Sequence, residues 1–193
     1  MIVLRNILVA TDFSETSDAA LRYGRDLART FGATLHLLNV APNVMASFAT
    51  DALPAVLPDV QRQVEEAARQ QLEALLDPED RTQLHAKPVV RTSLTAAAEI
   101  VEYAREAGID LIVIGTHGRG AMAHVLMGSV AERVVRTAPC PVLTVRHPER
   151  EFVLPDALVA VVRSSDQGIR KQAANATRVV FAAALVAAGM APP

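Results

Sequence analysis

Aromatic residues and excess positive charge are both scarce in this sequence. It contains five Phe, two Tyr and no Trp, so it lacks the stacking platforms with which proteins hold single-stranded bases. Its formal net charge is -2, which gives no general attraction to nucleic acid or to anionic lipid. We therefore expect no nucleic-acid partner.

Cysteine and long apolar segments are scarce as well. The single cysteine, Cys140, cannot form an intramolecular disulfide. It lies between Pro139 and Pro141, and we interpret it as a packing residue and not as a reactive thiol. No stretch reaches the ~18 apolar residues of a membrane span. The first residues read as a strand and not as a basic region followed by a long apolar run. We expect a cytoplasmic protein with no membrane partner.

Short apolar runs alternate with helical patterns along residues 2–145. Ser14 is a candidate N-cap and Gly32 a candidate C-terminal stop for the first helix, and residues 41–58 read as a long surface connection. We predict strands at 2–10, 35–40, 85–91, 110–115 and 141–145, and helices at 15–31, 60–76, 96–107 and 129–137. This alternation predicts an α/β fold, a doubly wound five-stranded parallel sheet in the order 3-2-1-4-5 with helices on both faces.

A sheet of this order opens a ligand crevice where strands 1 and 4 part, at their carboxyl ends. Thr11 and Asp12 directly follow the first of these strands, and a loop beginning at Gly115 follows the other. The fold alone therefore predicts a binding site between these two segments.

The loop after the fourth strand has the spacing of a phosphate site. Gly115 and Gly118 are followed, nine residues later, by Gly128 and Ser129. Glycines let a backbone approach phosphates closely and can take the positive φ that such a loop needs, and Gly128-Ser129 would open a helix whose N-terminus favours anions. The alternative is that the glycines only form turns and that Ser129 is an N-cap.

Two charged residues could complete the site, each with a plainer alternative. Asp12 could accept hydrogen bonds from ribose hydroxyls or help to hold a magnesium ion, or it could cap the helix that starts near Ser14. Arg119 could clamp a phosphate or remain a solvated side chain.

Other chemistries find little support in the sequence. His117 and His124 have no cysteine or acidic partner at metal-ligand spacing, so we predict no metal centre. Neither the lysine-bearing phosphate loop nor the G-x-G-x-x-G dinucleotide fingerprint is present. We identify no catalytic base and no hydrolase triad.

Five segments together resemble the universal stress protein family. They are Asn6 to Ser14, Leu38 to Val40, Gly115 to Gly120, Gly128 to Arg133 and Ala138 to Val142. They cover roughly residues 1–147 in the family's order. The pattern G-x2-G-x9-G-[ST], joined to the early Asp12, resembles the subgroup that binds ATP.

The resemblance implies residue roles that spacing alone does not. Val40 would contact adenine through its backbone, Thr11 and Asp12 would hold the adenosine portion, and the phosphates would be surrounded by Gly115, Gly118, Arg119, Gly128, Ser129 and Val130. The implied cofactor is ATP, with or without Mg²⁺. The implied partner is a second copy, paired through the last strand, Pro141 to Val145. The chain departs from the family at His124, where relatives often carry a stronger base, and in its long tail.

The predicted domain organisation is one universal-stress-protein-like nucleotide-binding domain at residues 1–147 and an extension at 148–193. The extension contains an apolar stretch, residues 179–188, and is interpreted as poorly ordered or as a docked helix.

Three functions remain open from the sequence. The first is an ATP-binding stress-response or regulatory protein, in which occupancy shifts a conformational or partner equilibrium. The second is a slow ATPase or a nucleotidyl-transferring enzyme. The third is a dimeric interaction module that binds no nucleotide.

Overall fold

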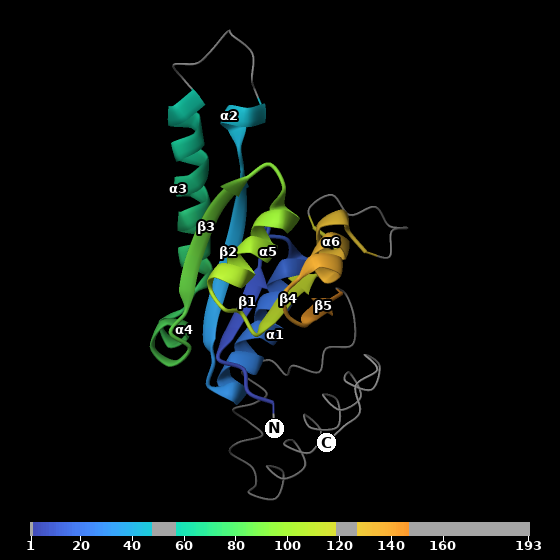
Figure 1. The fold of residues 1–193 in the computed structure, drawn as a ribbon. Helices are drawn as coiled ribbons and strands as arrows, with labels where there is room; N and C mark the ends of the chain where they lie inside the picture. The colour runs from blue at the N-terminus through green and yellow to red at the C-terminus, as the bar shows by residue number, and fades with distance from the viewer. Residues whose placement is uncertain (1, 48–56, 119–126, 147–193) are drawn as a thin grey trace, which may run out of the picture. The chain divides into compact units, whose positions relative to one another are not determined.

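The computed structural model describes residues 2–47, 57–118 and 127–146. Within them a five-stranded, all-parallel sheet has the order β3-β2-β1-β4-β5 (Figure 1). The strands are β1 (Asn6–Ala10), β2 (Thr34–Pro42), β3 (Lys87–Ser93), β4 (Leu111–Gly115) and β5 (Val142–Val145). The predicted fold class and strand order are confirmed.

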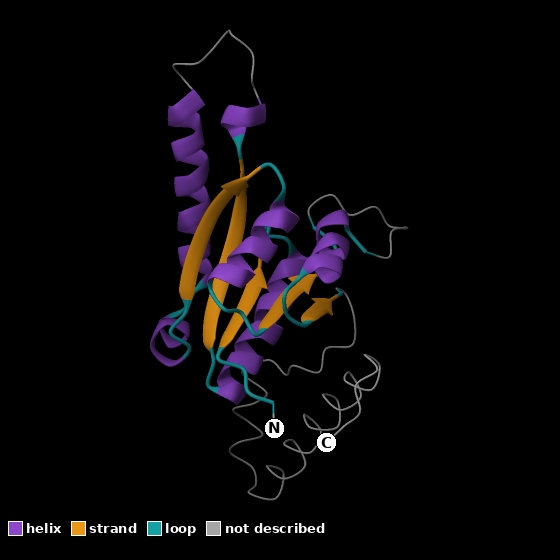
Figure 2. Ribbon diagram, in the orientation of Figure 1, coloured by secondary structure: helices purple, strands orange, loops and turns teal. Residues whose placement is uncertain are grey.

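Helices cover both faces of this sheet (Figure 2). On one face, α5 (Ala96–Glu106) and α6 (Ser129–Thr137) pack against Leu8, Leu38 and Ile112. On the other lie α1 (Glu15–Phe31) and α3 (Leu57–Leu75), and short helices α2 (Val44–Ser47) and α4 (Pro78–Gln83) complete the described elements. Near-continuous burial of β1 and β4 explains why their sequences do not alternate.

The first helix begins and ends where its capping residues predict. Ser14 is the N-cap, its side chain accepts a hydrogen bond from the Ser17 N–H, and the Ser17 hydroxyl accepts one from the Ser14 N–H. Gly32 follows the helix with φ 64°, the left-handed conformation that glycine adopts most readily. This helix places its first turn beside the carboxyl end of β1.

Several predicted boundaries were wrong for local reasons. The first strand begins at Asn6, not at Ile2, because Ile2 and Val3 are exposed and have no strand beside them in the register with β2. His85 has φ 46°, which is not strand geometry, and lies in the connection between α4 and β3, so β3 starts only at Lys87. Asp77 does more than end a helix, since it caps α4 with a reciprocal bond to Asp80.

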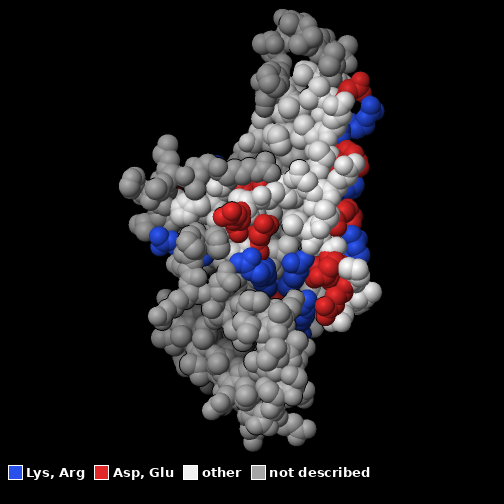
Figure 3. Space-filling view, turned by 180° about the vertical axis from the view of Figure 1, so that it is seen from behind, with Lys and Arg blue, Asp and Glu red and all other residues white. Residues whose placement is uncertain are grey.

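A buried ion pair joins the helices on the second face. Asp80 is fully buried, and its carboxylate accepts hydrogen bonds from the Arg25 guanidinium at 2.6–2.9 Å. Arg25 also donates to the Leu75 carbonyl, so one side chain connects α1, α3 and α4. Seen from behind, the described surface carries Lys and Arg side chains interspersed with Asp and Glu side chains (Figure 3).

Candidate functional site

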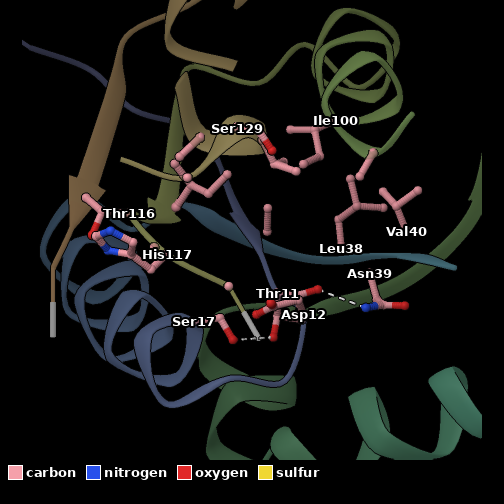
Figure 4. Close-up of a pocket in the computed structure, with 18 residues that line it drawn as sticks. Thr11, Asp12, Ser17, Leu38, Asn39, Val40, Ile100, Thr116, His117 and Ser129 are labelled. Atoms are coloured by element: carbon pink, nitrogen blue, oxygen red, sulfur yellow. Dashed lines mark hydrogen bonds between the residues drawn. The ribbon is translucent and has the colours of Figure 1, made fainter. Parts of the chain in front are cut away.

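A cavity of about 420 Å³ lies at the carboxyl ends of β1 and β4, where the topology places the crevice. Its volume is in the range of small-ligand pockets. Every predicted site residue that the structure describes lines it, from four separate stretches of the chain (Figure 4): Thr11, Asp12, Val40, Gly115, Gly118, Gly128, Ser129 and Val130. Arg119 and His124 lie outside the described residues.

The Thr11 hydroxyl belongs to a buried network at the corner between β1 and α1. It accepts a hydrogen bond from the Phe13 N–H and lies 3.0 Å from the Ser17 hydroxyl. The Ser17 hydroxyl donates to the Ser14 carbonyl, so the proton between the two hydroxyls comes from Thr11. The network therefore uses the single proton of the Thr11 hydroxyl. Toward a ligand, the Thr11 hydroxyl oxygen can only accept a hydrogen bond.

Asp12 contacts both sides of the cavity. Its Oδ1 accepts hydrogen bonds from the Ser14 hydroxyl at 2.6 Å and from the Ser14 N–H at 3.2 Å. A Cβ added at Gly118 would lie 2.5 Å from Oδ2. The alternative of Asp12 as helix cap is wrong, because Ser14 occupies that position and Asp12 supports it.

Phe13, next to Asp12, has φ 63°. A bulky residue in this region is strained, and such strain is concentrated at functional sites. Its N–H is held by the Thr11 hydroxyl. The corner that presents Asp12 is thus a fixed turn and not an open loop.

The three loop glycines are explained by close approach and not by positive φ. None of them lies in the left-handed region, which among the described residues holds Phe13, His85, Gly32 and Gly108, so the positive-φ expectation was wrong. A Cβ at Gly115 would lie 2.9 Å from Thr16 Cγ2, and one at Gly128 would lie 3.1 Å from the Thr116 carbonyl oxygen. Each glycine brings two segments of the cavity wall together.

The start of α6 forms one end of the cavity. Gly128 is its N-cap and makes no side-chain capping bond, so the alternative of Ser129 as the cap is wrong. Ser129 is exposed in the first turn and lines the cavity. First-turn N–H groups without a side-chain cap, together with the helix dipole, favour a bound anion.

Thr116 closes the base of the glycine loop. Its carbonyl accepts a 2.6 Å hydrogen bond from the Gly128 N–H, and its own N–H donates to the Val145 carbonyl at 2.7 Å. Its hydroxyl lies 3.1 Å from Nδ1 of His117. One residue therefore connects the loop to the start of α6 and to the end of β5.

The opposite wall is largely apolar. Leu38 and Val40 on β2 and Ala96 and Ile100 on α5 line this part of the cavity. The pairing of β2 with β1 ends opposite Ala10, and the Leu38 carbonyl accepts the last bond from this side, donated by the Thr11 N–H. Because backbone groups alternate sides along a strand, the N–H and C=O of Val40 point past the end of β1, toward the cavity.

Several lining residues were not identified from the sequence. Asn39 donates from its amide to the Thr11 carbonyl at 2.8 Å and so fixes β2 against the corner. In the sequence, only its place between Leu38 and Val40 pointed to a position at the cavity. Ser17, Thr116 and Ile100 also line the cavity, but each reads in sequence as an ordinary helix or strand-end residue.

Ionisable groups are few in the described lining, namely Asp12 and His117. The described residues contain no group of three or more side chains that could hold a metal ion, and none of their helices is long and apolar enough to cross a membrane. Cys140 is half-buried, and burial, followed by the nearby Asp110 charge, raises its pKa, which agrees with a packing role.

Comparison with known proteins identifies the family. The sequence profile described as "Universal stress protein family" matches residues 4–146. The chain belongs to this family. Universal stress protein MJ0531 of Methanocaldococcus jannaschii is 30% identical over 155 residues, which are 76% of this chain and 85% of that protein.

Solved structures of universal stress proteins share the fold. UspA of Lactobacillus plantarum is 28% identical with a TM-score of 0.63, over 76% of this chain and 100% of that one. A family member from Burkholderia pseudomallei is 34% identical with a TM-score of 0.55, over 73% of this chain and 95% of that one. The family match contains every element that lines the cavity.

Proposed function

We propose that this universal stress protein binds an adenine nucleotide, ATP foremost, in the cavity between the β1–α1 corner and the glycine loop. The single observation that carries the proposal is that Thr11, Asp12, Val40 and the glycines of the spaced pattern line one cavity of about 420 Å³. These residues come from distant parts of the chain and give the cavity one apolar end and one end that favours anions. A nucleotide has the same two parts, a flat base and negatively charged phosphates.

The base fits the apolar end. The side chains of Leu38, Ala96 and Ile100 offer apolar contact to a flat ring. The backbone N–H and C=O of Val40 supply one donor and one acceptor side by side, which matches the N1 and N6 edge of adenine. Guanine carries the reverse polarity at these positions, so this edge favours adenine.

The phosphates fit the other end. Gly118 and Gly128 contribute backbone and no side chain to that part of the wall, and the first turn of α6 supplies N–H groups and the positive end of its dipole. We propose that Ser129 donates its hydroxyl to a phosphate oxygen. Arg119, outside the described residues, remains the predicted phosphate clamp.

Magnesium fits as an ion carried by the nucleotide. Mg²⁺ is usually held by one or two carboxylates together with substrate phosphates, and Asp12 is the carboxylate of the described lining. When bound, the ion would neutralise phosphate charge. Asp12 would serve either this ion or a ribose hydroxyl, and comparing ATP affinity with and without Mg²⁺ separates the two.

A regulatory role agrees with the site better than efficient turnover. Asp12 Oδ1 already accepts two hydrogen bonds from Ser14, and His117 contacts the Thr116 hydroxyl. Both groups are therefore already engaged with protein atoms in the described part of the chain, whereas a general base must reach the proton that it removes. We propose that the protein acts through binding of the nucleotide and not through its hydrolysis, with at most slow ATPase activity.

We also propose that two copies pair through β5. The two edges of the sheet differ: β3 carries Lys87, Pro88 and Arg91, which discourage pairing, whereas β5 reads Val142, Leu143, Thr144 and Val145. Val135 on the neighbouring α6 is 46% exposed. Leu143→Lys should convert a dimer to a monomer in light scattering, and an unchanged mass would reject this interface.

The function is tested by identifying any nucleotide that copurifies and then measuring turnover with Mg²⁺. Bound ATP with negligible turnover supports the proposal. Many turnovers per minute would instead support an enzyme, and absence of any nucleotide binding would support an interaction module.

A further inference from the structure

Ser14 makes contacts in two directions with one hydroxyl. Its oxygen accepts the Ser17 N–H, as the N-cap of α1, at 3.3 Å. Its proton goes to Oδ1 of Asp12 at 2.6 Å, the shortest bond of the β1–α1 corner. A serine N-cap needs only the acceptor, so the donated bond is additional to the cap.

The donated bond fixes which way the Asp12 carboxylate faces. The Ser14 N–H adds a second bond to the same oxygen at 3.2 Å. With Oδ1 held by Ser14, the other oxygen lies beside Gly118, where an added Cβ would be 2.5 Å from it. Phe13, at φ 63° between the two residues, turns the chain so that they meet.

We propose that Ser14 is a positioning residue for nucleotide binding: it orients Asp12 toward the ligand and need not touch the ligand itself. The inference rests on the proposed function. Ser17 lines the cavity and Ser14 does not, so the effect of Ser14 on affinity would pass through Asp12. Without the Ser14 hydroxyl, the Asp12 carboxylate would have to become ordered when the ligand binds, and this loss of entropy would weaken binding.

Exchanging the cap separates the two roles of Ser14. Ser14→Asp retains a preferred N-cap acceptor, but a carboxylate cannot donate to Asp12 and places a second negative charge beside it. Ser14→Thr retains both donor and acceptor. Ser14→Gly removes the donor while costing the helix little, and it serves as the second variant if Ser14→Asp lowers stability. The matched control is Asp77→Ser, a swap between preferred caps at α4, which has the same reciprocal capping arrangement.

The experiment measures ATP affinity by calorimetry and melting temperature for the full chain and each variant. We expect Ser14→Asp and Ser14→Gly to bind ATP about tenfold more weakly or worse, the size expected from loss of one charge-assisted bond. Ser14→Thr should restore affinity, and Asp77→Ser should bind like the parent. In an Asp12→Ala background, Ser14→Asp should cause no further loss, because its effect passes through Asp12.

The outcomes distinguish this inference from the proposed function. A parent protein that does not bind ATP overturns the proposed function and this inference with it. A parent that binds, with Asp12→Ala weakened but Ser14→Asp and Ser14→Gly unchanged, overturns the positioning role alone. Equal losses from Ser14→Asp with and without Asp12 also overturn it, since Ser14 would then act independently.

Discussion

The Asp12 carboxylate lies against the α-carbon of Gly118, so closely that a Cβ atom at Gly118 would be 2.5 Å from Oδ2. Contacts this short do not occur between real side chains, so one of the two residues would have to move. The contact joins the first strand's corner to the glycine loop across the cavity. It makes Asp12 and Gly118 one unit of the site.

Gly118→Ala should therefore weaken ATP binding because the added methyl group displaces Asp12, even though alanine is small. We expect a loss of about tenfold or more, the scale of one charged hydrogen bond, with little change in melting temperature because Gly118 is exposed and not held at positive φ. Calorimetry with ATP measures the first and thermal unfolding the second.

Gly108→Ala is the matched control for this glycine. Gly108 has φ 59° with open space around it, so alanine there should cost stability through backbone strain and leave ATP affinity unchanged. If Gly118→Ala bound ATP like the parent, the contact with Asp12 would have no bearing on the site.

Asp12→Ala should lower ATP affinity by roughly one to two decades, equivalent to about 1.5–3 kcal/mol. It also removes the acceptor of the Ser14 hydroxyl, so the free energy of unfolding should fall by about 1 kcal/mol as well, the scale of one hydrogen bond. Asp12→Asn keeps an acceptor oxygen for Ser14 but not the charge, and should restore stability more than affinity. Normal affinity with lowered stability in both variants would reduce Asp12 to a structural residue.

Asp80→Ala should destabilise the fold without acting on the site. It leaves the Arg25 guanidinium, whose side chain is 19% exposed, without its buried partner. Removing one member of a buried pair costs about 3 kcal/mol or more, measurable by urea unfolding.

The control for Asp80 is Glu73→Ala, which breaks the Arg81–Glu73 pair. Both of those side chains are more than 40% exposed, so the expected loss is within about 1 kcal/mol. Equal effects of the two substitutions would contradict the structural importance given to the Arg25–Asp80 pair.

His36 should make stability depend on pH below neutrality. Burial, with a smaller contribution from Lys87, lowers its pKa to about 4 from 6.5. Between these values the unfolded chain binds the proton and the folded protein does not, so stability is fully present above pH 6.5 and falls as pH drops toward 4, by at most roughly 1.4 kcal/mol per pH unit.

His36 is in contact with a tyrosine that in turn contacts an arginine, so its substitution is the test of this pH dependence. Nδ1 of His36 lies 2.7 Å from the Tyr103 hydroxyl, and Arg91 lies over the Tyr103 ring. His36→Leu should flatten the pH dependence of the melting temperature between about pH 4 and 6.5, the window set by the two pKa values. An unchanged slope in this variant would assign the acid sensitivity to other groups.

The fold was predictable because its signals are local and repeated. The apolar runs of β1 and β4, the Ser14 cap and the Gly32 stop each specify an element without help from distant residues. The short helices α2 and α4 were missed because their sequences lack an apolar period, and α4 depends on the Asp80–Arg25 contact, which exists only in the folded chain.

For the cavity, the sequence predicted part of the lining but not the contacts within it. The spacing of Gly115, Gly118 and Gly128 and the position of Asp12 at a strand end were enough to place them at one cavity. Sequence could not show that Gly118 is required by Asp12, or that Ser14 holds Asp12, since both depend on side-chain positions across the β1–β4 crevice. Asn39 was missed for the same reason.

The most direct test of nucleotide binding is calorimetric titration of the full chain, stripped of any copurified ligand, with ATP and Mg²⁺, run in parallel with GTP. We predict one saturable site per chain for ATP, weaker or absent binding of GTP, and ATP affinity lower by roughly one to two decades in Asp12→Ala. A flat ATP titration, or equal binding by the parent and Asp12→Ala, would contradict this prediction.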